Sequence, residues 1–474
     1  MKSETKTELE TKPSDNAATE SLTDSANTST TTKANINANT NSDPGSETKE
    51  LNPVANRTSG ADVIAGISVA LVIIPQSLAY AQLAGLPASA GLFAAALPLL
   101  VFALFASSPF LQTGPVALTS LLTFAALTGG GLEPGTEQYV AGAMLLALMV
   151  AVLRFGLGLS RLGKIADLIS KPVLQGFTNA AAIIILASQL PKAIGADGVI
   201  PEDLSTLRSA FWAITHPSAY NPAALGVAGV TLFFMFGGRK LHKLFPGVLL
   251  AAVLFLVISA SGFYDGTIIG DPNPLPEGLP GLSFDFDFGL LSSLITGALI
   301  VALVGFAEPT AIAKTFAEEH NQRWSVNREL MASGAANFVA AISGALPVGG
   351  SFSRSALNKL AGAQSRWSGM VTGLVVLAFL PFASILNDLP QAVLGAVVVG
   401  AAIKLVKPNQ FKEQFANSKV DGAIMVITFV ATLAFAPQIH WALLIGVAAT
   451  YVARLVKHDP NDERDSESAA APAR

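Results

Sequence analysis

Long apolar segments alternate with short polar connections from about residue 61 to residue 456. Fourteen segments have the length, or nearly the length, of a membrane-spanning helix, which needs about 20 mostly apolar residues. The pattern therefore predicts an all-α polytopic membrane protein with 14 transmembrane segments. The seven segments of the first half cover 61–80, 88–107, 114–127, 138–159, 172–190, 222–237 and 246–262, and those of the second half cover 290–308, 329–344, 351–363, 368–386, 389–405, 420–436 and 438–456.

Both ends of the chain differ in kind from this central part. Residues 1–56 are rich in Ser, Thr, Asn, Lys and Glu and almost free of large apolar side chains. Such a composition cannot bury enough surface to fold, so we expect a disordered cytoplasmic tail. The stretch also lacks the apolar core of a secretory signal peptide. Residues 459–474 form a short polar tail.

Composition narrows the class further. Of the 474 residues, 51% are hydrophobic and 13% charged, against about 25% charged in soluble domains. The absence of cysteine excludes disulfides, thiolate catalysis and cysteine-bound metals. No basic patch with interleaved aromatic residues suggests nucleic acid, and no GxSxG, HExxH or P-loop pattern suggests an enzyme. We expect no catalytic residues, no metal and no cofactor.

The positions of lysine and arginine predict the topology. An even number of spans places both termini on one side, and basic residues favour cytoplasmic connections. With the termini inside the cell, nearly all the basic residues between the spans, Arg154 among them, are assigned to internal connections, and only Lys192 and Arg208 lie outside. We therefore expect a multi-pass protein of the inner (plasma) membrane with both termini cytoplasmic.

Two of the segments are too short to cross a membrane. Residues 114–127 would form a helix of about 21 Å, whereas the hydrocarbon core is about 30 Å thick. Thr113 is a candidate cap, and Pro115 suits a first helical turn. The segment at 351–363 follows two glycines, and Ser351 is its candidate hydroxyl cap.

These short segments are the third of each set of seven. Because seven is odd, the second set enters the membrane from the opposite side, which predicts inverted repeats at about 61–262 and 290–456. Short segments interrupted by Gly or Pro at corresponding positions indicate a transporter whose site lies between the N-termini of two half-helices. The candidate substrate-binding residues there are Gly114, Pro115, Val116 and Ala117 in the first repeat and Ser351, Phe352 and Ser353 in the second. All of them except proline offer a backbone N–H group. Alternatively, the small residues serve close helix packing and the serines bond to the preceding helical turn.

Arg354 is the one basic residue assigned to membrane depth away from a segment end. A charged side chain there costs about 2.5–3.5 kcal/mol on insertion scales and usually marks a functional site. Arg354 either supplies positive potential to an anion site or pairs with Glu308 as a fixed strut. The two roles are compatible.

Three separated motifs resemble the SulP (sulfate permease) family, whose animal branch includes prestin and the pendrin-like anion exchangers. The motifs are PQSLAYAQLAGLPASAGLF at 75–93, QTGPVALTSLL at 112–122 and PVGGSFSRSALNKLAGAQS at 347–365. The resemblance extends from about Ala61 to Leu455, so residues 57–458 are expected to form a SulP-type transmembrane transporter domain. Most members carry a cytoplasmic STAS domain after the last helix, and we expect none here.

The resemblance implies core and gate domains, half-helices 3 and 10 around the substrate, and an elevator-type alternating-access mechanism. It also places residues of the first helix beside the substrate, and it allows a homodimer. These residues are Gln76, Ser77 and Tyr80. Periodicity alone puts only two of the three on one helix face, and a polar group beside a proline can be purely structural.

The predicted function is secondary active transport of a small inorganic anion across the lipid bilayer, with sulfate and protons as the first choice. A buried carboxylate shifts toward its neutral form, so Glu308 could carry the coupling proton. The alternatives are sodium-coupled bicarbonate transport, in which Glu308 and Thr310 would supply part of a cation site, and a passive anion channel or exchanger.

Overall fold

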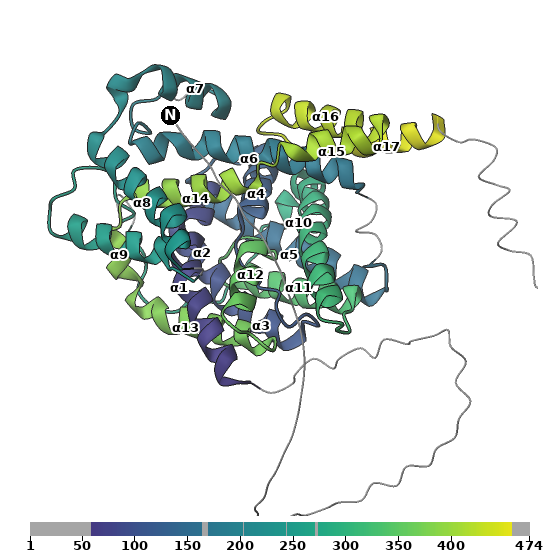
Figure 1. Ribbon diagram of the computed structural model, residues 1–474, viewed down its shortest axis with the longest axis horizontal. Helices are drawn as coiled ribbons and strands as arrows, with labels where there is room; N and C mark the ends of the chain where they lie inside the picture. Colours follow the sequence, from purple (N-terminus) through teal and green to yellow (C-terminus); the bar gives the residue numbers. More distant parts are fainter. Residues whose placement is uncertain (1–57, 164–168, 202, 243, 271–273, 457–474) are drawn as a thin grey trace, which may run out of the picture. The chain divides into compact units, whose positions relative to one another are not determined.

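The computed structural model describes residues 58–163, 169–201, 203–242, 244–270 and 274–456, and both predicted tails lie outside these ranges. All regular elements in the described part of the chain are helices, with one isolated bridge between Ile268 and Pro390 (Figure 1). The all-α prediction is confirmed.

Every predicted segment coincides with a helix or with two consecutive ones. The predicted segment 88–107 forms two helices that meet at Ala96, just before Pro98. The first repeat also contains an unpredicted short helix between its fifth and sixth segments. Its elements are α1 (Gly60–Leu83), α2 (Ala88–Ala95), α3 (Leu97–Phe105), α4 (Ala117–Gly129), α5 (Glu137–Leu159), α6 (Lys171–Ile194), α7 (Thr206–Thr215), η2 (Pro217–Ala219), α8 (Pro222–Leu241) and α9 (Gly247–Ala260).

In the second half of the chain a short helix, α12, again forms the third predicted segment, whereas the single helix α11 takes the place of α2 and α3. This half also contains an unpredicted short helix, α15, that precedes the last two spans. Its elements are η3 (Phe288–Leu290), α10 (Leu291–Glu319), α11 (Val326–Ile342), α12 (Phe352–Leu360), α13 (Trp367–Phe379), η4 (Leu380–Asp388), α14 (Gln391–Leu405), α15 (Asn409–Asn417), α16 (Lys419–Ala434) and α17 (His440–Val456).

Seven helical stretches in the described ranges are long and apolar enough to cross a membrane. Four further apolar helices are shorter, and one of them is α4. The predicted half-helix character of α4 and of the nine-residue α12 is therefore visible in their lengths.

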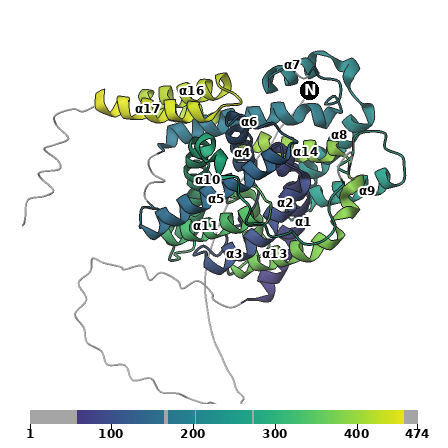
Figure 2. The same cartoon turned by 180° about the vertical axis from the view of Figure 1, so that it is seen from behind.

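The helices pack in two groups. In the first, α11 lies against α5 and α3, α10 against α4 and α5, and α1 against α2 and α13. In the second, α6 lies against α14 and α16, and α8 against α9 and α14. Figure 2 shows α5, α10 and α11 side by side from behind. We call these two sets the core group and the gate group. They meet through contacts such as α1–α14 and α4–α6.

Two buried carboxylates fix the connections next to the half-helices. Asp62, in the first turn of α1, accepts hydrogen bonds from the backbone N–H groups of Gln364 and Ser365 at 2.8 and 2.9 Å. Glu329, in the first turn of α11, accepts bonds from the backbone N–H and the hydroxyl of Ser107 at 2.8 and 2.6 Å. Charge-assisted bonds of this kind are stronger than neutral ones. The end of α12 and the approach to α4 are therefore held by long-range contacts.

Candidate functional site

The two half-helices begin in different ways. α12 begins at Phe352, and Ser351 caps it, since its hydroxyl accepts a bond from the Arg354 N–H at 3.4 Å. The predicted hydroxyl cap is thus confirmed. α4 begins only at Ala117, after extended backbone at Val116 and without a side-chain cap.

The predicted roles of Thr113 and Pro115 at the start of α4 are therefore wrong. Pro115 lies before the helix instead of in its first turn. The Thr113 hydroxyl donates to the Gly349 carbonyl at 3.1 Å instead of capping α4. The physical reason is that the backbone here is extended and finds its partners in the other repeat.

The extended segments before the half-helices pair with each other. The Gly349 N–H donates to the Gly114 carbonyl at 3.0 Å, and the Ser351 N–H donates to the Gln112 carbonyl at 2.9 Å. One number rises while the other falls, so the pairing is antiparallel. We call residues 112–116 and 348–351 the crossing.

The crossing depends on small residues. Gly114 has a φ of +124°, which favours glycine. A Cβ on Gly349 would lie 3.0 Å from the Thr119 methyl group and 3.4 Å from the Gly305 carbonyl oxygen. The half-helices α4 and α12 thus begin next to each other, at two closely packed backbone segments. Their first N–H groups have no partner within the helix, and they carry the positive end of the helix dipole.

Arg354 is buried beside the crossing, with 1% of its surface exposed. Its Nη2 donates to the Thr113 carbonyl at 3.3 Å. Its Nε and Nη1 have no hydrogen-bond partner among the described residues. Buried guanidinium donors without a partner are costly, so this is a place where an anion would be stabilised.

Arg354 and Glu308 do not form the fixed strut that was the alternative. The ion pairs found in the described ranges are Lys314–Glu318 and Lys359–Glu319. Arg354, Glu308 and Tyr80 nevertheless act on one another electrostatically, and the ammonium group of Lys407 also acts on Glu308. Glu308 is half-buried.

α10 contacts the crossing at Pro309, the residue that follows Glu308. Pro309 lies against Gly350, since a Cβ on Gly350 would stand 2.9 Å from the Pro309 ring. Thr310 is half-buried, and its hydroxyl donates to the Phe306 carbonyl at 2.8 Å. No three Asp, Glu, His or Cys side chains of the described residues converge as a metal site.

The three candidates on α1 have different surroundings. Tyr80 is 5% exposed, and it interacts electrostatically with Arg354 and Glu308. Gln76 is 6% exposed, and its Oε1 has no hydrogen-bond partner in the described part of the chain. Ser77 is fully buried, its hydroxyl donates to the Ile74 carbonyl, and its own carbonyl lies against Gly91 of α2. Ser77 thus faces α2 and is separated from Tyr80, Arg354 and Glu308.

The candidates at the half-helix starts also differ in exposure. Val116 and Ala117 are 8% and 6% exposed. Phe352 is 58% exposed, and Ser353 is exposed with its hydroxyl 3.4 Å from that of Ser351. The α12 start therefore presents its side chains outward, whereas the α4 start is packed.

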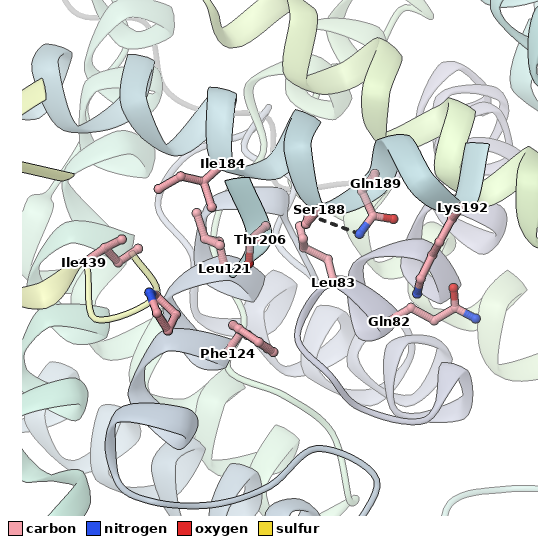
Figure 3. Close-up of a pocket in the computed structure, with 11 residues that line it drawn as sticks. Gln82, Leu83, Leu121, Phe124, Ile184, Ser188, Gln189, Lys192, Thr206 and Ile439 are labelled. Carbon is pink, nitrogen blue, oxygen red and sulfur yellow. Dashed lines mark hydrogen bonds between the residues drawn. The ribbon is translucent and has the colours of Figure 1, made fainter. Parts of the chain in front are cut away.

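A cavity of about 180 Å³ lies apart from these residues, where the core and gate groups meet (Figure 3). Leu121 and Phe124 of α4 face Ile184, Ser188 and Lys192 of α6 across it. None of the predicted site residues lines it.

Sequence reasoning missed one buried cation. Arg154 was assigned to an internal connection, but it lies within α5 and is fully buried. The assignment was wrong because the guanidinium finds acceptors inside the protein, two of them on α10. Its spacing from Arg161, two helical turns further on, is the only sequence signal that it lies deeper than the segment end.

The sequence matches the model of the sulfate permease family over residues 60–428. The chain is 32% identical over 399 residues to "Sulfate transporter 4.1, chloroplastic" of Arabidopsis thaliana, which covers 82% of this chain and 58% of that protein. The chain thus spans somewhat more than half the length of that relative.

Two solved structures share the fold. The structure of SLC26A9 superposes with a TM-score of 0.76 at 23% identity, covering 84% of this chain and 66% of that one. The transmembrane domain of the cyanobacterial bicarbonate transporter BicA gives 0.68 at 22% identity, covering 84% and 99%. At these identities the likeness establishes the all-α polytopic fold. With the family model matching more than three quarters of its length, the chain belongs to the sulfate permease family.

Proposed function

We propose that this protein is a secondary active transporter of a small inorganic anion, with sulfate as the first substrate. The observation that carries the proposal is the buried guanidinium of Arg354 beside the starts of α4 and α12. Two of its nitrogens have no hydrogen-bond partner within the described ranges. Helix N-termini and backbone N–H groups form anion sites without a tight salt bridge, which suits a substrate that must also be released.

Tyr80 and Glu308 complete the proposed site. The Tyr80 hydroxyl is a neutral donor near Arg354, and Glu308 is the acid that interacts with both. We propose that Glu308 takes up a proton when the anion enters, because a carboxylate and a dianion repel each other in a low dielectric. A proton would then accompany each anion inward.

The movement we propose is an elevator. α4 and α12, which packs on α1 and α10, belong to the core group, whereas α6, α8, α9, α14 and α16 belong to the gate group. Displacement of the core group along the gate group would carry the crossing from one side of the membrane to the other. We also propose that the protein lies in the plasma membrane with both termini cytoplasmic. It could form a homodimer there.

Uptake into proteoliposomes tests the function. We expect radiolabelled sulfate to accumulate when the outside is made more acidic than the inside, and to equilibrate without accumulation when the pH is equal. Uptake of neither sulfate nor bicarbonate under any imposed gradient of protons or sodium would contradict the proposal. An ohmic sulfate current in planar bilayers, unaffected by pH, would identify a passive channel instead.

Sodium-coupled bicarbonate uptake is the second candidate. It is favoured by the likeness of the fold to the transmembrane domain of a bicarbonate transporter. Glu308 and Thr310, two residues apart on α10, would each contribute an oxygen ligand to sodium. The same proteoliposomes, loaded to give a sodium gradient at constant pH and supplied with labelled bicarbonate, distinguish this candidate from proton-coupled sulfate uptake.

The elevator movement can be tested by cross-linking, because the chain has no cysteine of its own. Leu121 of α4 and Ile184 of α6 line the same cavity from the core and gate groups (Figure 3). We expect the pair L121C and I184C, joined by a short bismaleimide, to lose at least about nine tenths of sulfate uptake, because groups tied together cannot slide past each other.

The matched control joins two cavity residues within the core group, L83C and L121C. These move together in an elevator, so the same reagent should leave uptake nearly unchanged. Full uptake after complete cross-linking of the first pair would exclude relative movement of α4 and α6.

A further inference from the structure

Arg154 is a second guanidinium buried at the crossing, and the proposed mechanism does not use it. Its Nε and Nη2 donate to the carbonyls of Ala302 and Val301 on α10 at 3.1 and 2.8 Å. Its Nη1 donates to the Ser333 hydroxyl and to the Val348 carbonyl, both at 2.9 Å. Arg154 thus ties α5 to α10, α11 and the segment before α12.

All four acceptors are neutral. No carboxylate lies within ion-pair distance of Arg154 in the described part of the chain. Taking an ion out of water costs several kcal/mol, and neutral carbonyls offset this only in part. Four bonds orient the guanidinium, but its positive charge stays unbalanced inside the membrane domain.

The charge lies directly behind the crossing. Val348, which accepts from Arg154, precedes Gly349, the residue that bonds to Gly114. A Cβ on Gly305 would meet Arg154 Nη2 at 2.6 Å and the Thr119 methyl group at 3.0 Å. Gly305 and Thr119 also surround Gly349. Arg154 therefore lies next to the glycine backbone that leads into the half-helices.

Arg154 and Arg354 bind equivalent positions in the two repeats. Arg354, of the second repeat, donates to the Thr113 carbonyl, three residues before the N-cap of α4. Arg154, of the first repeat, donates to the Val348 carbonyl, three residues before the N-cap of α12. Each half-helix start therefore has a guanidinium from the opposite repeat bonded to the backbone that leads into it.

We propose that Arg154 is a second cationic positioning residue of the anion site. It acts without touching the substrate: its four bonds orient the guanidinium, and its charge adds to the positive potential that the bound anion balances. The inference rests on the proposed function, because it assigns to Arg154 a share in the affinity of that same site.

The test compares sulfate binding by the full-length protein in lipid nanodiscs. The variants are R154K, which keeps the charge, and R154Q and R154M, which remove it. We expect R154K to bind sulfate within about threefold of the wild type and the two neutral variants to bind it about tenfold more weakly. The matched control is R323Q, which removes an exposed arginine and should leave the Kd unchanged. Melting temperatures without anion report on folding.

The outcomes separate the two proposals. Equal weakening in R154K and the neutral variants, or loss of the folded protein in all three, would make Arg154 a packing strut and overturn the inference, as would unchanged binding by R154Q. In each case the wild type still binds sulfate, so the proposed function stands. A wild type that binds neither sulfate nor bicarbonate would remove the proposed function and this inference together.

Discussion

R354Q is expected to weaken sulfate binding about thirtyfold and to reduce uptake accordingly. The variant keeps a hydrogen-bonding side chain but removes the charge and the two nitrogens, Nε and Nη1, that have no partner among the described residues. A hydrogen bond to a charged group contributes about 1.5–3 kcal/mol, and about 1.4 kcal/mol corresponds to a factor of ten. Titration of the purified protein with sulfate measures the change.

R354K separates charge from geometry. Lysine retains the positive charge but lacks the planar guanidinium, which donates to the Thr113 carbonyl and could bind an oxyanion at the same time. We expect its affinity to lie between those of the wild type and R354Q. R323Q, at an exposed position, controls for the loss of one arginine. An unchanged Kd in a folded R354Q would show that the anion binds elsewhere.

E308Q is expected to reduce the accumulation of sulfate driven by a proton gradient at least about tenfold, while sulfate–sulfate exchange persists. Glutamine resembles the protonated carboxyl in shape and in the absence of charge, so the site should still accept the anion. Because glutamine cannot gain or lose a proton, the proton gradient cannot drive sulfate uptake through this residue. In the wild type, uptake should rise as the outside becomes more acidic, and in E308Q it should be flat between about pH 6 and pH 8.

The matched control is E318Q on the same helix. The Glu318 side chain is 68% exposed and lies 3.9 Å from Lys314, a surface pair of the kind that contributes little. Uptake by E318Q should keep the full dependence on pH. Concentrative, pH-dependent uptake by E308Q equal to that of the wild type would remove Glu308 from the coupling mechanism.

The sequence predicted the helical order because spanning segments carry a strong local signal. Apolar length located α1, α5, α6 and α10, and the motif around Ser351 located the start of α12 with its hydroxyl cap. Both features depend on residues close together in the chain. The short helices α7 and α15 were missed because each is polar on one side and too short to register as a span.

Contacts between the repeats could not be predicted in the same way. Thr113 has the chemistry of a helix cap, and only the Gly349 carbonyl, 236 residues away, diverts its hydroxyl. Arg154 near a segment end has the pattern of a topology signal, and only the carbonyls of α10 and of Val348 show that it points inward. The locations of the half-helices were predictable, but the pairing between them and the second cation were not.

The pairing at the crossing also bears on how such a chain could have arisen. Each repeat supplies one extended segment of the pair: the Gly349 and Ser351 N–H groups have their acceptors at Gly114 and Gln112. A half-length ancestor would have left those groups unsatisfied at membrane depth, which costs several kcal/mol for each group. Such an ancestor would have needed a second copy of itself to supply the missing acceptors.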